Sequence, residues 1–489
     1  MGRRLPLTAT TVTLLVLALT SLVAVHEAKA FGNTGFDYLC SPYYLRPQDT
    51  HACFTAYNDY CYVFMHEGDY FSPGIRYLCF CWDGSEMDEI RSGYITEDVY
   101  GTYIKVGYDV LPYSVDDYYG YKYPDYAYAE RLMFVWCYPT LVGQYYIEPV
   151  IAYKEFSINS DGSLTETKSG WVDTSVILHS PALAYEKFGS AYGGHILCAY
   201  FRYVDWPFNE DRLFVAYYGD DEKWYRSRVA TYKLSGSKTQ KVYMDLFPAH
   251  YGAIAVYSQY HNDWGEWRLV GCKIWWDSDA GKFKGTTHII DYGLPDGNQH
   301  KWAAWTIKYG DYTYLFVFYA WENSGTLKIY KTKQNYWGLV KTITSICTYG
   351  GVSYTPEDVG LAVYDTYNEI WCFWSRKSGD WVYYYATRVY WGNGAPSSSS
   401  RKLGTHKLGQ RNWGGCGDLQ VAPEVNWGAS YYDDDYRAST YIVVSGNPDA
   451  DNAGKVYASL VGATNIHRYP SDSIYARTPP SGQTQHVKK

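Results

Sequence analysis

Short apolar runs rich in aromatic residues alternate with turns along most of this chain. Residues 302–309 form one such run, Gly310 and Asp311 follow as a turn, and residues 312–319 form a second, more aromatic run. A Gly-containing turn then leads into a third run at 326–330. Runs of this length between turn residues predict β-strands. The pattern after the N-terminal segment favours strands throughout and offers no convincing helix.

This unit of three or four strands recurs about every 50–70 residues, a spacing typical of repeat folds. The predicted inner strands open the units at residues 51–57, 123–128, 181–185, 251–257, 302–309, 358–364 and 421–427. One unit cannot bury both faces of its small sheet, whereas units packed around an axis bury all of them. We therefore predict an all-β fold, a β-propeller of seven blades, with six or eight blades as alternatives. A pair of β-sandwiches or a β-helix would also use short strands.

The N-terminus has the pattern of an export signal. Arg3 and Arg4 precede an uncharged apolar stretch at 7–25, and Ala28-Lys29-Ala30 forms a small-x-small cleavage site before Phe31. The apolar stretch is nearly long enough for an uncleaved membrane anchor, which is the alternative. We predict a signal peptide at 1–30, a propeller at 31–470 and a polar C-terminal tail at 471–489. The mature protein is then secreted or held at the cell surface, without a membrane span.

Composition narrows the choice of partner. Aromatic residues make up 19% of the chain, including 57 Tyr and 19 Trp, and these side chains suit half-buried sheet faces. The formal net charge is -8, and no basic run is long enough to follow a phosphate backbone. We therefore do not expect nucleic acid as a partner.

Eleven cysteines in an exported chain predict disulfides. Cys61 lies one strand away from Cys79 and Cys81, and we expect a bridge from Cys61 to one of these two. Because the number of cysteines is odd, at least one thiol either stays free or forms an intermolecular disulfide with another chain.

Two segments resemble a known turn motif. Asp277, Asp279 and Gly281 lie in a run that follows an apolar strand, and residues 331–337 end in Trp after another strand. Both resemble the Asp box, Ser-x-Asp-x-Gly-x-x-Trp, so the chain is similar to the sialidase-like BNR/Asp-box propellers along most of its mature length. The Arg-Ile-Pro motif of sialidases is absent, so the resemblance implies the fold and not sialidase activity.

Polar side chains precede or open most predicted inner strands. In a propeller these positions surround a central funnel, where a ligand site is expected. The candidates for substrate binding are His51, His250, His300, Glu357, Asp358 and Glu424, and His179 holds the same place in the third unit. Histidines and carboxylates together can hold a divalent metal such as zinc or calcium, or exchange protons. Capping of turns at strand starts is the structural alternative.

The segment that begins at His179 is similar to the His-x-x-Pro segment of propeller-type polysaccharide lyases. Such lyases use His, Tyr and Arg in the funnel. The resemblance therefore implies catalytic roles for His179, His195, Arg202 and Tyr203.

Other candidate sites lie in loops. Asp449 and Asp451 alternate with small residues before a glycine, an arrangement that can wrap calcium, although a plain polar hairpin loop has the same composition. Loop-borne Trp206 and Trp264 could stack on the C–H faces of sugar rings. Packing between blades is the alternative role for tryptophan.

These features lead to one main functional hypothesis: a secreted propeller that binds an extracellular polysaccharide in its funnel and cleaves it, as a lyase or a glycoside hydrolase. A non-catalytic lectin and a surface structural or adhesion protein are the alternatives, so enzymatic activity itself stays open.

Overall fold

The structure is a computed structural model of the whole chain. It describes residues 31–41, 50–55, 60–67, 74–82, 86–96, 108–113, 130–142, 146–174, 181–186, 195–204, 210–233, 244–261, 265–294, 301–321, 324–364, 368–392, 395–412, 418–422, 426–427, 438–446 and 455–462. The predicted signal peptide and C-terminal tail lie outside these residues and stay predictions.

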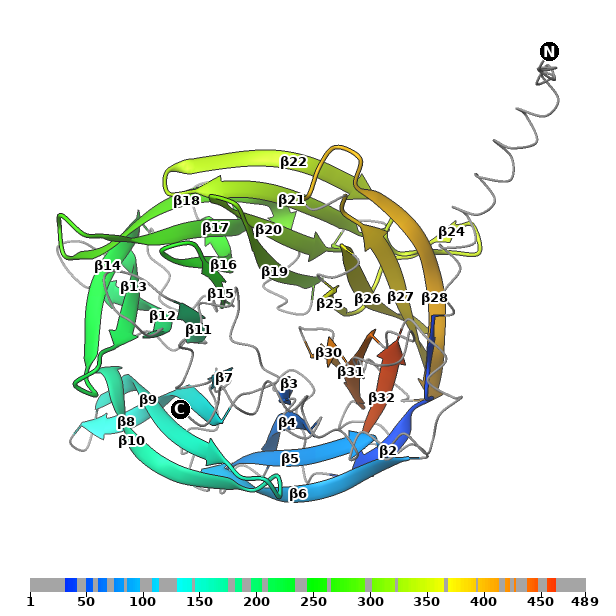
Figure 1. The fold of residues 1–489 in the computed structure, drawn as a ribbon, viewed down its shortest axis with the longest axis horizontal. Coiled ribbons are helices and arrows are strands. Elements are labelled where there is room, and N and C mark those ends of the chain that lie inside the picture. The colour runs from blue at the N-terminus through cyan, green and yellow to red at the C-terminus, as the bar shows by residue number, and fades with distance from the viewer. Residues whose placement is uncertain are drawn as a thin grey trace, which may run out of the picture.

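Seven antiparallel sheets stand around one axis, so the prediction of a seven-bladed β-propeller is confirmed (Figure 1). Blade 1 holds β3 (Thr50–Thr55), β4 (Tyr60–Glu67), β5 (Gly74–Trp82) and β6 (Met87–Thr96). Blade 2 holds β7 (Tyr108–Tyr113), β8 (Arg131–Val142), β9 (Tyr146–Ile158) and β10 (Leu164–Thr174). Blade 3 holds β11 (Ala182–Glu186), β12 (His195–Val204), β13 (Glu210–Tyr218) and β14 (Trp224–Lys233).

The later blades repeat this plan, with the first strand innermost. Blade 4 holds β15 (Met244–Ala249), β16 (Gly252–His261), β17 (Glu266–Asp277) and β18 (Lys282–Leu294). Blade 5 holds β19 (Trp302–Tyr309), β20 (Tyr312–Tyr319), β21 (Thr326–Lys333) and β22 (Tyr336–Thr344). A small hairpin of β23 (Thr348–Tyr349) and β24 (Val352–Ser353) precedes blade 6, which holds β25 (Val359–Tyr364), β26 (Glu369–Ser378), β27 (Trp381–Tyr390) and β28 (Arg401–Asn412).

The two ends of the chain meet in blade 7. Its C-terminal part consists of β29 (Asp418–Val421), β30 (Asn426–Trp427), β31 (Ala438–Ser445) and β32 (Val456–Gly462), and the N-terminal strands β1 (Gly32–Asn33) and β2 (Asp37–Cys40) both pair with β32. Phe31, the residue after the predicted cleavage site, packs edge-on against Trp371 of blade 6, with ring centroids 5.0 Å apart. The N-terminal segment therefore closes the ring.

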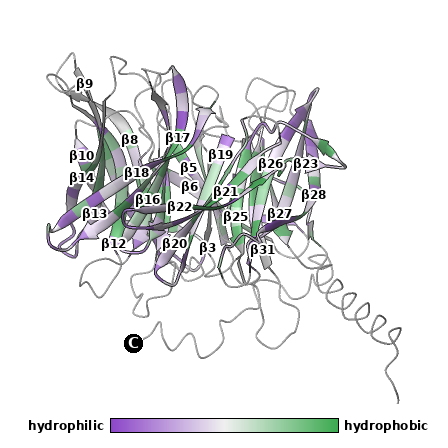
Figure 2. Cartoon of the chain, turned by 90° about the horizontal axis from the view of Figure 1, so that it is seen from above, coloured by the Kyte–Doolittle hydropathy of each residue, from purple (hydrophilic) through white to green (hydrophobic). Residues whose placement is uncertain are grey.

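Apolar contacts between blades form the core. The described positions of the second strand in each four-stranded blade are almost wholly buried, whereas the outermost strands consist mainly of exposed and partly buried positions. Figure 2 shows this difference as hydrophobic stretches in β26 and hydrophilic stretches in β22 and β28. Trp371, Trp374 and Trp391 are fully buried. Many of the aromatic residues thus fill the wedge between neighbouring sheets, as aromatic-rich strands require.

In three blades the observed inner strand is not the predicted one. In blade 2 the inner strand is β7, while residues 123–128 lie outside the described residues. In blade 4 the inner strand is β15, so residues 251–257 belong to the second strand, β16. In blade 7 the inner strand is β29, which begins at Asp418, earlier than predicted. The predictions for blades 1, 3, 5 and 6 are confirmed to within about two residues, the usual uncertainty of strand ends.

The expected bridge from Cys61 is wrong. Cys61 pairs with Phe80 across β4 and β5, so its side chain shares the face of Phe80. Because side chains alternate along a strand, Cys79 and Cys81 point to the opposite face. No disulfide joins any two of the nine cysteines whose side chains the structure describes, and all nine are buried. Burial raises the pKa of the Cys79 thiol to about 12, which makes it unreactive.

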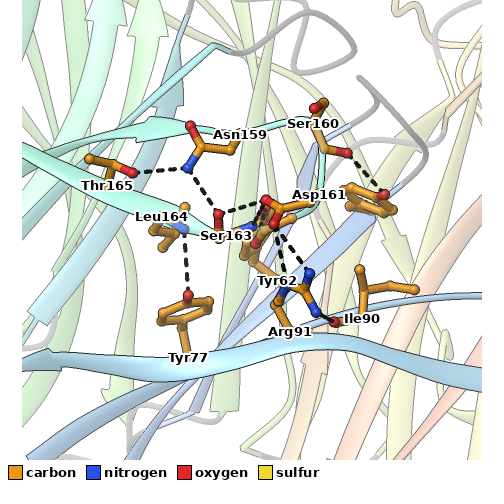
Figure 3. A network of polar contacts seen from close by, with 12 residues as sticks. Tyr62, Tyr77, Ile90, Arg91, Asn159, Ser160, Asp161, Ser163, Leu164 and Thr165 are labelled. Atoms are coloured by element: carbon orange, nitrogen blue, oxygen red, sulfur yellow. Dashed lines mark hydrogen bonds and ion pairs between the residues drawn. The ribbon is translucent and has the colours of Figure 1, made fainter.

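The turns between third and fourth strands fasten neighbouring blades. The turn after β9 rests on blade 1: Asp161 pairs with Arg91 at 3.3 Å, and the Tyr62 hydroxyl donates to the Gly162 carbonyl at 3.0 Å (Figure 3). The Asp277 turn lies at the same place in blade 4, between β17 and β18. There the Asp277 carboxylate accepts the amide hydrogens of Asp279 and Ala280.

Within the part of the chain that the structure describes, no helix is long and apolar enough to cross a membrane.

Candidate functional site

The inner strands run side by side in the same direction. The Leu183 amide, at the second residue of β11, donates to Asp109, at the second residue of β7. The Thr306 hydroxyl, at the fifth residue of β19, donates to the Pro248 carbonyl, at the fifth residue of β15. We call the end where these strands begin the leading end of the axis, and the other the trailing end.

Two aspartates at the leading end each tie their own blade to the next one. Asp109 accepts hydrogen bonds from the Val110 amide at 2.8 Å and from the Leu183 amide of blade 3 at 2.7 Å. Asp358, directly before β25, does the same with the Val359 amide at 2.7 Å and the Leu419 amide of blade 7 at 2.7 Å. Each carboxylate therefore holds its own strand start and the neighbouring inner strand.

Asp245 holds the equivalent position in β15 but differs from the other two. No hydrogen bond from any residue that the structure describes reaches its carboxylate, which stays partly exposed. Burial raises the pKa of Asp245 to about 6. Burial also raises the pKa of Asp109 to about 8, and the negative charge of Asp245 adds to this effect against the two backbone hydrogen bonds.

At neutral pH the carboxyl groups of Asp109 and Asp245 are in opposite protonation states. With these pKa values Asp109 keeps its proton while Asp245 is mostly ionised. Two carboxyl groups whose pKa values are pushed apart can act as general acid and general base at one centre. Asp109 is held in place by backbone amides, and Asp245 is left to take a proton from a ligand or from water.

A second group of charged side chains gathers at the trailing end. Lys308 near the end of β19 forms an ion pair with Glu186 at the end of β11, which links blade 5 to blade 3. Lys273 of blade 4 is 1% exposed and donates to the His250 carbonyl at 2.8 Å. Burial lowers the pKa of Lys273 to about 7, the Lys308 charge lowers it further, and the Glu186 charge opposes both.

Among the predicted catalytic residues, the structure does not bring His195 and Arg202 together. His195 begins β12 at the trailing end, where its Nδ1 lies 3.1 Å from the Tyr218 carbonyl. Arg202 and Tyr203 are seven and eight residues further along the same extended strand, which separates them from His195 by about 23 Å or more. Arg202 lies 3.9 Å from the buried carboxylate of Asp173, between blades 2 and 3.

The remaining predicted positions divide between the two ends and the undescribed residues. His250 lies in the turn after β15, at the trailing end, because the strand it was expected to precede is the second strand of its blade. Asp358 and the partly buried Glu357 lie at the leading end. His51 lies within β3, and its side chain, like that of Tyr203, is outside the described part. His179, His300, Glu424, Trp206, Trp264, Asp449 and Asp451 lie outside the described residues.

The described residues contain no group of three or more His, Cys, Asp or Glu side chains that could hold a metal ion. The calcium site predicted at Asp449 and Asp451 falls outside that search and stays a prediction.

Asp109 and Asp245 were missed because the inner strands of their blades were placed too late in the sequence. A signal for them exists. An aspartate followed by Val or Leu lies directly before the inner strand or within its first two residues at four places: Asp109, Asp245, Asp358 and Asp418. This short repeat, in register with the blades, marks the leading end of the axis.

Comparison with known proteins supports no family assignment: the sequence matches no protein-family model, and no curated protein resembles it significantly. Among solved structures it is similar to a Bombyx mori GH32 β-fructofuranosidase (10% identity, 91% of this chain and 95% of that chain covered, TM-score 0.36). It is also similar to an α-L-arabinofuranosidase from Fusarium graminearum (14% identity, 73% of this chain and 92% of that chain covered, TM-score 0.32). A third similar structure is a Mycobacterium tuberculosis puromycin-hydrolyzing peptidase (10% identity, 85% of this chain and 61% of that chain covered, TM-score 0.30). Likeness at this level extends across enzymes of different chemistry and carries no conclusion about substrate.

Proposed function

We propose that this protein is a secreted, carbohydrate-active β-propeller that binds a polysaccharide at the leading end of its axis and hydrolyses it. The observation that carries the proposal is Asp245. It is an axial carboxylate with no hydrogen-bond partner among the described residues, and it lies close enough to Asp109 for its charge to raise that residue's pKa.

The chemistry of glycoside hydrolysis needs two carboxyl groups in opposite protonation states. One protonates the departing sugar oxygen, and the other activates water or attacks the anomeric carbon. At neutral pH Asp109 can donate its proton to the glycosidic oxygen. Asp245 can then act as a base that takes a proton from the attacking water, or as a nucleophile that attacks the anomeric carbon. When water adds across the broken bond, both products are saturated.

A binding function without cleavage is favoured by a different observation. Tyr94, Trp171 and Tyr292 occupy the same position in the outer strands of blades 1, 2 and 4, each directly before a β-bulge. All three are about half exposed, with Trp171 at 51%. Arg268 lies over the ring of Tyr292, 5.1 Å from its centroid. Half-exposed aromatic rings at repeated positions suit stacking on sugar rings, so a lectin is the second candidate.

The first test is incubation of the purified protein with a panel of acidic and neutral polysaccharides, followed by analysis of new chain ends. The proposal predicts saturated reducing ends from at least one substrate. Unsaturated ends would indicate elimination by a lyase and would contradict the roles given to Asp109 and Asp245. Binding without any new ends would replace hydrolysis by the lectin function.

A further inference from the structure

The outer part of blade 6 exposes aromatic side chains at the leading end. Successive strands of a blade alternate in direction, so β27 begins at the leading end, as β25 does. Trp381, the first residue of β27, is 40% exposed, and its indole makes no hydrogen bond or ring contact with the described residues. Tyr349 of the β23–β24 hairpin is also exposed, and its ring lies 5.1 Å from that of Tyr385.

Pairing across the sheet brings two cations to the same face as Trp381. Arg376 of β26 pairs with Tyr383 of β27, two residues along the strand from Trp381, and Lys407 of β28 pairs with Tyr385. Directly paired residues share a face of the sheet, as do alternate residues along a strand. The Arg376 guanidinium lies 4.8 Å from the Tyr383 ring centroid, and the Lys407 ammonium lies 4.9 Å from it. One aromatic ring therefore has both charges beside it.

The guanidinium of Arg376 is held in a fixed orientation. It lies 4.1 Å from the ring centroid of Tyr354 as well as beside Tyr383, and its Nε donates to the Tyr385 hydroxyl at 3.1 Å. The two terminal nitrogens make no hydrogen bond with the residues that the structure describes, and neither is buried. A planar carboxylate can accept two parallel hydrogen bonds from such a group.

The charges around Arg376 favour an anionic ligand. Neither Arg376 nor Lys407 forms an ion pair within the described part of the chain, and the Lys407 ammonium donates to the neutral Gln410 side chain at 2.9 Å. Asp380, in the exposed turn before Trp381, forms no ion pair there either. Residues 368–412 contain seven Lys or Arg and only two acidic residues, whereas the whole chain has a net charge of -8. This local excess of positive charge attracts an anion.

The same features select the kind of anion. Two cations are too few to follow a phosphate backbone, and the net negative charge of the chain opposes a long polyanion. An exposed indole beside a carboxylate-binding guanidinium suits a sugar ring that carries one carboxylate, because the C–H face of the ring can stack on the indole.

We infer that the outer part of blade 6 holds a second binding site, which takes a uronic acid residue of a polysaccharide. The sugar carboxylate lies against the terminal nitrogens of Arg376, the Lys407 ammonium adds to the attraction, and the ring stacks on Trp381. Figure 1 shows β27 and β28 at the rim of the ring and β15 beside its axis, so this site is separate from the Asp109–Asp245 pair. It does not depend on the hydrolysis proposed there.

The test is calorimetric titration of the purified protein with galacturonate and glucuronate, with galactose and glucose as their neutral counterparts. At least one uronate is expected to bind about 10-fold more tightly than its counterpart, and Arg376→Met should weaken its binding about 10- to 100-fold through lost charge-assisted hydrogen bonds. Arg376→Lys keeps the charge without the planar fork and should fall between the two. Trp381→Ala should weaken binding about 3- to 10-fold through lost stacking. Because Trp381 is exposed, Tm should stay unchanged in that variant.

Matched controls come from blade 5. Lys333→Met removes a cation that is paired with Asp311 at 3.2 Å, and Tyr336→Ala removes an aromatic ring that is 52% exposed. Both should leave uronate binding unchanged. Asp245→Asn should also bind uronate normally, so failure of the hydrolysis proposal and failure of this one are distinguishable.

Four results would overturn the inference. They are absence of binding by either uronate, equal affinity for each uronate and its neutral counterpart, and binding unaffected by both Arg376→Met and Trp381→Ala. The fourth is tighter binding of a single-stranded oligothymidylate than of the uronates, which would assign the same surface to nucleic acid.

Discussion

Asp245→Asn is expected to lower the rate of polysaccharide cleavage roughly a hundred- to ten-thousand-fold, the usual effect of removing a general base or acid. Asparagine has nearly the same shape, but it cannot take up a proton or attack as an anion. Because the Asp245 carboxylate makes no hydrogen bond with the described residues, no native contact is lost. The decisive measurement is kcat on the substrate that the polysaccharide panel identifies.

Stability should not fall with that substitution. Burial raises the pKa of Asp245 from 3.8 to about 6, so above pH 3.8 the unfolded chain gives up the proton more readily than the native state does. The native state therefore loses stability as pH rises through this window, and Asn removes the loss. Tm at neutral pH should stay equal or rise. Asp291→Asn, on the outer strand of the same blade, is the matched control and should keep full activity. A fully active Asp245→Asn variant would contradict the assignment.

Glu369→Ala is expected to cost about 3–5 kcal/mol of unfolding free energy, as removal of one partner from a buried ion pair does. Glu369 accepts from Arg388 at 2.6 Å and 2.8 Å and from the Trp371 indole at 3.0 Å, and it is buried. Alanine would leave the guanidinium charge and the indole N–H without their acceptor inside blade 6. Equilibrium urea unfolding measures the difference.

An exposed ion pair provides the comparison for Glu369→Ala. Asp311 pairs with Lys333 at 3.2 Å in the exposed turn after β19, so Asp311→Ala should cost below about 1 kcal/mol. Glu369→Gln keeps an acceptor oxygen and should fall between the two. A loss for Glu369→Ala no larger than that for Asp311→Ala would show that the Arg388 ion pair does not hold blade 6 together.

The propeller could be predicted because each blade repeats the same local pattern. Residues 302–309 and 358–364 were recognised as inner strands since each follows a turn and precedes a more aromatic strand. The inner strand of blade 4 was missed because residues 244–249 contain Asp245 and Pro248, whereas the buried second strand at 252–261 has the stronger apolar pattern. Hydrophobicity identifies the most buried strand of a blade, which is not the one beside the axis.

The candidate site depends on that distinction. Because β16 was predicted to be the inner strand in place of β15, His250 was expected at the leading end and Asp245 was not identified as a candidate. The roles of Asp358 and Asp109 depend on amide groups of the next blade, at Leu419 and Leu183, which no local pattern relates to them. The pKa of Asp245 differs from its usual value because the carboxyl group is buried and no backbone amide in the described part of the next blade donates to it. Both conditions depend on three-dimensional packing.

The pH dependence of kcat/KM for polysaccharide cleavage tests the central claim most directly. The base Asp245 must be ionised, so the rate should rise with pH through about 6, and the acid Asp109 must be protonated, so the rate should fall as pH passes about 8. The account predicts a bell-shaped profile with its maximum between these values. A profile that is flat from pH 5 to pH 9, or that is maximal at either end of this range, would contradict it.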